Sequence, residues 1–156
     1  MITALAIAVP ARLEDKDVMD KMILNPSLKT FVNLVAKAGL IETLKEDGPY
    51  TVFAPNDDAF AKVPAHVLNG LKKDPELLKK VLTYYMVESR IESKDLKVGT
   101  LDSILGEKAK VTGAKDGLRI NGAKLISVDD KADNGIIQIV DTVFFAPSLA
   151  KQIAKL

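Results

Sequence analysis

Few side chains in this sequence have the types and spacing that catalysis requires. Cysteine is absent, which excludes disulfides, thiolate nucleophiles and zinc–thiolate sites. His66 is the one histidine, and no H-E-x-x-H pattern accompanies it. No nucleophile elbow, catalytic triad or glycine-rich phosphate loop is present. We therefore predict no catalytic, cofactor-binding or metal-binding residue and no enzyme activity, with His66 on a surface loop between helices.

Acidic residues from Asp130 to Asp141 partly match a calcium-binding loop. Position 3 of the twelve-residue EF-hand pattern is Ala132, and position 12 is an aspartate instead of the bidentate glutamate. The residues that follow favour a strand, whereas an EF-hand continues as a helix. These departures predict that no EF-hand forms, and they leave open weak cation binding by Asp129, Asp130 and Asp133.

A strand, a corner and a helix are predicted by the stretch G-P-Y-T-V-F-A-P-N-D-D-A-F at positions 48–60. Tyr50–Phe53 is a β-branched and aromatic run typical of a short buried strand, and Pro55 ends it. Asn56 is a suitable N-cap for the helix that follows. The next two residues are aspartates in the first helical turn, where the helix dipole favours negative charge. We predict a structural role for both carboxylates.

Helices are predicted on both sides of this corner. Apolar residues recur at three- and four-residue steps over positions 15–38, which predicts two helices, the second beginning at Pro26. Another amphipathic helix follows Asp74-Pro75.

Strands dominate the second half. Asp116-Gly117 and Asn121-Gly122 are typical of tight hairpins, so a three-stranded meander is expected over 109–112, 118–121 and 124–128. Gly135–Phe145 is apolar at nearly every position, which predicts a central strand. These elements together predict an α+β fold, with helices packed on a twisted, largely antiparallel sheet. Tyr50–Phe53 and Gly135–Phe145 are expected to pair at its centre.

The composition is that of a globular protein. The chain has 156 residues, 47% of them apolar, and a net charge of +1, which gives no reason to expect nucleic acid or an anionic membrane as a partner. The apolar run at positions 2–9 is too short to span a bilayer. With Val9-Pro10-Ala11 it is consistent with a signal-peptide remnant or an N-terminal extension over 1–11, followed by one domain over 12–156.

Two motifs resemble the signatures of the fasciclin domain family. T-V-F-A-P-N-D-D-A-F at positions 51–60 is similar to the first signature, and N-G-I-I-Q-I-V-D-T-V-F-F-A-P at positions 134–147 is similar to the second, with Gln138 in place of the usual histidine. A-G-L-I-E-T-L at positions 38–44 also resembles the segment that precedes the first signature in the family. The residues that carry the resemblance are Thr51, Val52, Phe53, Ala54, Pro55, Asn56, Ala59, Phe60, Tyr84, Asn134, Gly135 and Asp141.

The resemblance implies a secreted, periplasmic or cell-surface adhesion domain that binds a protein or matrix component without a cofactor, as a monomer or weak homodimer. The alternative is a carrier of a small hydrophobic ligand such as a lipid. By similarity to integrin-binding members of the family, an interaction surface is expected at Asp129, Tyr84 and Tyr85. Tyr85 replaces the histidine of that surface and Asp130 replaces its isoleucine, so integrin-dependent adhesion is not expected.

Overall fold

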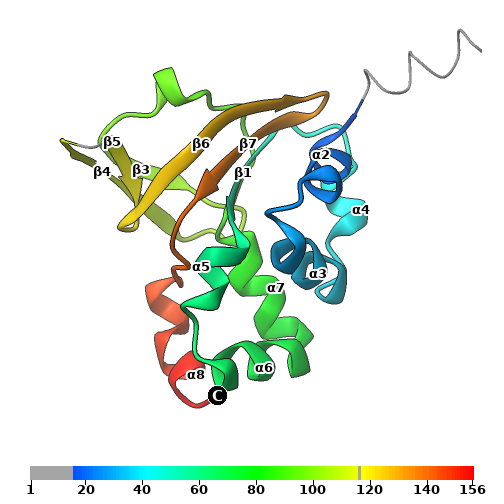
Figure 1. The fold of residues 1–156 in the computed structure, drawn as a ribbon. Coiled ribbons are helices and arrows are strands. Elements are labelled where there is room, and N and C mark those ends of the chain that lie inside the picture. Colours follow the sequence, from blue (N-terminus) through cyan, green and yellow to red (C-terminus); the bar gives the residue numbers. More distant parts are fainter. Residues whose placement is uncertain (1–15, 116) are drawn as a thin grey trace, which may run out of the picture.

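The two strands expected at the centre of the sheet, β1 (Tyr50–Pro55) and β7 (Gly135–Val140), lie side by side in the computed structural model (Figure 1). The structure describes residues 16–156 except residue 116. The strands run parallel, with Tyr50 opposite Gly135 at one end and Pro55 opposite Val140 at the other. Every residue of both strands is buried, which confirms that they are central.

Seven strands of the described residues form one sheet in the order β2-β1-β7-β6-β5-β4-β3. All neighbouring pairs except β1 and β7 are antiparallel. The sheet curls until its two edges approach each other, where the Ile104 amide donates to the Met86 carbonyl at 2.8 Å. The predicted α+β fold with a largely antiparallel sheet is confirmed. The remaining strands are β2 (Met86–Val87), β3 (Gly99–Asp102), β4 (Lys108–Ala114), β5 (Gly117–Ile120) and β6 (Ala123–Ala132).

The helices form two groups around this sheet (Figure 1). The first group lies beside the central strands and comprises α2 (Val18–Leu24), α3 (Lys29–Lys37) and α4 (Ile41–Leu44). The second group lies below the sheet in the figure and comprises α5 (Asp57–Ala61), α6 (Ala65–Lys73), α7 (Pro75–Thr83) and α8 (Ala150–Ala154). Two short 3₁₀ helices, η1 (Ser93–Asp95) and η2 (Pro147–Leu149), complete the described elements.

Local signals in the sequence place several of these boundaries. The Asn56 side chain caps α5 by accepting from the Ala59 amide at 2.9 Å. Asp74 caps α7 in the same way, accepting from Leu77 at 3.1 Å. Asn121 and Gly122 both have positive φ, 48° and 84°, as the tight turn between β5 and β6 requires.

Three expected boundaries were wrong. Pro26 does not begin a helix, because α2 ends at Leu24 and the Asn25 carboxamide accepts from the Ser27 amide at 2.9 Å, which fixes a turn. His66 lies on α6 instead of a loop, although it is exposed. β7 stops at Val140 and does not continue to Phe145. The next residue, Asp141, is only partly buried, and its carboxylate accepts from the Lys124 amide at 2.9 Å.

The second signature begins with two residues that fix the start of β7. The Asn134 side chain is buried; its amide donates to the carbonyls of Leu44 at 2.8 Å and Glu46 at 2.6 Å, and its oxygen accepts from Val18 at 2.9 Å. One asparagine therefore joins α2, the end of α4 and β7. At Gly135 an added Cβ would lie 2.0 Å from the Tyr50 carbonyl oxygen. The close approach of β1 and β7 thus needs glycine at this position.

We predict that Gly135→Ala lowers the free energy of unfolding by about 1–3 kcal/mol or more, because backbone atoms of β1 must move to admit the methyl group. Gly113→Ala in β4 is the matched control, since its new Cβ would meet only Val98 Cγ2 at 3.4 Å. Urea denaturation of both variants measures the difference. Equal stability of Gly135→Ala and the wild type would contradict this account of the β1–β7 contact.

Candidate interaction site

Tyr85, one of the residues expected on the interaction surface, is inside the protein. Its side chain is 1% exposed, and its ring contacts Phe144 with centroids 4.4 Å apart and Phe31 at 6.1 Å. The hydroxyl donates to the Phe144 carbonyl and accepts from the Phe144 amide at 2.9 Å. Burial raises the pKa of this hydroxyl. Tyr85 therefore packs α7 against the chain that follows β7, and it offers nothing to a partner.

Tyr84 is buried as well, at 2% exposed. Its hydroxyl donates to the Lys108 carbonyl at 2.9 Å and accepts from the Asn121 carboxamide at 2.6 Å. The side chain joins the end of α7 to β4 and to the β5–β6 turn. Buried tyrosines usually satisfy the hydroxyl in this manner.

Asp129 lies in β6, partly buried, with a positive φ of 60°. Both of its carboxylate oxygens are engaged: Oδ1 accepts from the Ser93 amide at 2.8 Å and Oδ2 from the Ser93 hydroxyl at 2.6 Å. The Gln138 amide adds a third bond to Oδ1 at 3.0 Å. The hydrogen bonds from Ser93, followed by that from Gln138, hold the pKa of Asp129 below its usual range.

Gln138, which replaces the family's histidine, completes this network from the middle of β7. It is fully buried; its oxygen accepts from the Asp129 amide at 2.8 Å, and its nitrogen also donates to the Ile91 carbonyl at 3.1 Å. These bonds tie an irregular part of β6 to the crossover, which we define as residues 88–98 between β2 and β3 and which contains η1. Asp129 is thus a structural residue. It does not share an exposed surface with Tyr84 and Tyr85, so the structure corrects the expected interaction surface.

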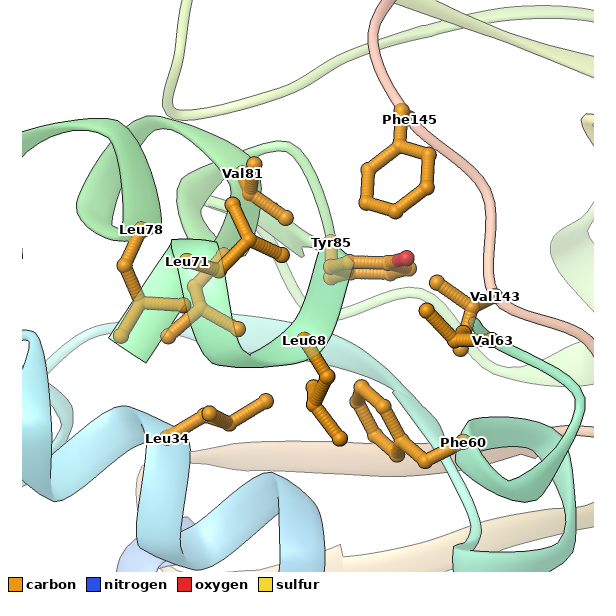
Figure 2. Close-up of a pocket in the computed structure, with 11 residues that line it drawn as sticks. Leu34, Phe60, Val63, Leu68, Leu71, Leu78, Val81, Tyr85, Val143 and Phe145 are labelled. Carbon is orange, nitrogen blue, oxygen red and sulfur yellow. The ribbon is translucent and has the colours of Figure 1, made fainter. Parts of the chain in front are cut away.

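The apolar cavity among the lower helices is nearly closed (Figure 2). Its volume is about 10 Å³, whereas a pocket for a drug-sized ligand needs about 300 Å³ or more. Figure 2 shows the side chains of Phe60, Leu68, Val143 and Phe145 around this space, together with that of Tyr85. A cavity of this volume has room for about one water molecule and none for a lipid chain.

An open groove lies between the two edges of the sheet, and we call it the edge groove. It is lined by Val87, Glu88, Ser89, Ile91, Thr100, Leu101, Asp102, Ser103 and Ile104, and its volume is about 520 Å³. One wall follows β2 and the other is β3. The β2 wall is held by the buried Thr51 of the first signature, whose hydroxyl donates to the Ser89 carbonyl at 2.6 Å and accepts from the Ile91 amide at 2.8 Å.

The edge groove carries negative charge. Asp102 lies on the β3 wall and is paired with Lys108 at 2.7 Å. Glu88 on the opposite wall is exposed and makes no ion pair with any described residue. Burial, followed by the negative charges of Glu46, Glu88 and Asp47, raises the pKa of Tyr50 at the start of β1. Of these three acids, Glu88 lines the groove. The sequence did not reveal this site, because it predicted no strand over Gly99–Asp102, the residues of β3.

The described residues include no cluster that could bind a metal ion. Over residues 16–115 and 117–156, no three His, Cys, Asp or Glu side chains lie close enough together to hold one. What the groove offers is backbone hydrogen-bonding groups, carboxylates and some apolar surface. That chemistry suits reversible binding of another chain.

Comparison with known proteins identifies the family. Residues 26–146 match the family model of the fasciclin domain, so the chain belongs to this family. Protein sll1483 from Synechocystis sp. is 39% identical over 126 residues, which cover 79% of this chain and 69% of that protein. Cell surface glycolipoprotein MPB83 from Mycobacterium bovis is 33% identical over 129 residues, covering 80% of this chain and 58% of that protein.

The fold is similar to that of a solved FAS1 domain pair from the insect cell adhesion molecule fasciclin I. The TM-score is 0.75 at 16% sequence identity, and the match covers 85% of this chain and 52% of the solved chain. This chain therefore spans a little over half the length of the mycobacterial relative and about half of the insect structure. None of its helices within the described ranges is long and apolar enough to cross a membrane.

We predict that Asp129→Asn removes a pH-dependent part of the stability. The lowered pKa of Asp129 means that its contribution is fully present above the unfolded-state pKa of about 3.9 and is lost as the pH falls through the lower folded-state value. The free energies of unfolding of wild type and variant should therefore differ most above about pH 4 and converge in more acidic solution. Urea denaturation across the pH range tests this, with the exposed Asp133→Asn as the control. A constant difference at all pH values would contradict it.

Proposed function

We propose that this chain is a non-enzymatic interaction domain that acts at the cell surface or outside the cell, where it binds a protein or matrix component. The observation that carries the proposal is the edge groove, an open site about 520 Å³ in volume with both polar and apolar lining residues. Membership of the fasciclin family supports this role, as does similarity to a protein named as a cell surface glycolipoprotein. Such contacts need no cofactor.

The direct test measures binding of the labelled protein to the envelope of the cells that produce it. Saturable binding that unlabelled protein displaces is the expected result. An unrelated protein of similar size and charge serves as the control for non-specific adsorption. Binding no greater than that of the control protein would contradict the proposed function.

Integrin-dependent adhesion is not part of this role. The carboxylate of Asp129 already accepts three hydrogen bonds from within the protein, and Asp130 next to it forms an ion pair with Lys21 at 2.9 Å. We predict that integrin-bearing cells attach to a coated surface of this protein no better in divalent cations than in a chelator. Chelator-sensitive attachment that Asp129→Ala abolishes would overturn this prediction.

A role as a lipid carrier is not favoured, because the apolar cavity is too small for an acyl chain. Since a ligand that binds only the folded state must raise the melting temperature, we predict no rise on adding saturating fatty acid or phospholipid. Thermal denaturation followed by circular dichroism is the measurement. A concentration-dependent rise in melting temperature would show that the helices open to form a larger pocket.

A further inference from the structure

The backbone of β3 has an edge that faces the edge groove. In antiparallel strands, residue pairs alternate between hydrogen-bonded and non-hydrogen-bonded. Lys110 in β4 bonds toward β5, because its carbonyl accepts from the Asn121 amide at 2.8 Å and its amide donates to the Asn121 side chain at 2.7 Å. Lys110 is opposite Thr100 in β3. The backbone groups of Thr100, and by the same alternation those of Asp102, must therefore point away from β4.

No described residue satisfies these groups. The amides and carbonyls of Thr100 and Asp102 form no backbone hydrogen bond outside the β3–β4 ladder, and both residues are exposed. A strand edge of this kind is a template for pairing with a further chain.

The opposite wall repeats the arrangement. The backbone carbonyl of Tyr85 points toward β1 and accepts from the Phe53 amide at 2.8 Å. The backbone carbonyl of Met86 points away from β1 and accepts from the Ile104 amide at 2.8 Å. The next residue of that outward set is Glu88, whose backbone groups bond to no described residue. The sheet is therefore sealed at Ile104 and Met86, and its edges separate from there toward Glu88 and Thr100. The strand directions make the two walls antiparallel to each other.

We propose that the edge groove binds an extended, basic segment of a partner protein, which enters between β2 and β3 as an added strand. The proposal rests on the proposed function and names the chemistry of the partner. Backbone hydrogen bonds to Thr100, Asp102 and Glu88 supply the pairing. The exposed carboxylate of Glu88, which forms no ion pair with a described residue, selects a cationic segment. Leu101 and Ile91 give apolar contact to alternate side chains.

The probe is a synthetic peptide, acetyl-Lys-Val-Lys-Val-Thr-Val-Lys-amide, which alternates apolar and polar or cationic residues as a strand requires. Two control peptides accompany it, one with glutamate in place of each lysine and one N-methylated at its central amides. Titration followed by amide NMR shifts should give saturable changes at Glu88, Thr100 and Asp102 with the probe alone. Equal binding of the glutamate or N-methylated peptide, or shifts confined to other surfaces, would overturn the proposal.

Two variants test the groove itself. Glu88→Lys should weaken probe binding about tenfold or more, whereas Asp133→Lys, an exposed charge reversal in the β6–β7 turn, should change it less than about twofold. Thr100→Pro removes an amide that faces the groove and not β4, so it should abolish binding without breaking the β3–β4 ladder. If thermal denaturation shows that Thr100→Pro does not fold, Glu88→Lys decides. Unchanged probe binding by Glu88→Lys would overturn the proposal.

Envelope binding of the same variants separates the two claims. Reduced envelope binding by Glu88→Lys but not by Asp133→Lys supports both the proposed function and the groove as the site of partner binding. Envelope binding that both variants retain overturns the groove as the site of partner binding and leaves the proposed function standing. Probe binding at the groove without any envelope binding contradicts the proposed function and leaves the peptide-binding chemistry standing.

Discussion

The close parallel contact of β1 and β7 is the constraint on which the rest of the structure depends. It is closest where Gly135 faces Tyr50, and only a residue without a side chain fits there. Two buried polar residues have fixed positions relative to this contact, one immediately before β7 and one within it. Asn134 binds α2 and α4 at its start, and Gln138 binds β6 and the crossover in its middle. The buried polar groups therefore set the positions of the surrounding elements as well as satisfying one another.

The same arrangement leaves the sheet incompletely closed. β2 is only two residues long, since the chain leaves α7 directly before it and turns away after Val87. The Thr51 hydroxyl in β1 holds the segment that follows β2. A backbone hydrogen bond from Ile104 to Met86 joins the two edges of the sheet, and no described backbone bond joins β3 to the segment after Val87. Exposed strand edges are normally covered or blocked. Here they form the walls of the edge groove. The short β2 and the Thr51 hydrogen bonds therefore also shape the proposed binding site.

The sequence predicted what depends on neighbouring residues and missed what depends on distant ones. The cap at Asn56, the cap at Asp74 and the turn at Asn121-Gly122 follow from local chemistry, and the central position of β1 and β7 follows from their apolar character. The hydrogen bonds and ring contact of the buried Tyr85 were not predictable, because its partner Phe144 lies 59 residues further along the chain. The role of Asp129 depends on Ser93 and Gln138, and the edge groove depends on strands that meet only when the sheet curls.

Amide hydrogen exchange across β3 tests the central claim, an open pairing edge beside a closed core, most directly. The amides of Gly99 and Leu101, which face β4, should exchange slowly, and the Ile104 amide should be protected by its bond to Met86. The amides of Thr100, Asp102 and Glu88 should exchange orders of magnitude faster, at rates close to those of exposed loops. Protection of Thr100 and Asp102 equal to that of Leu101 would show that the edge is already paired in the free protein, and would contradict the account.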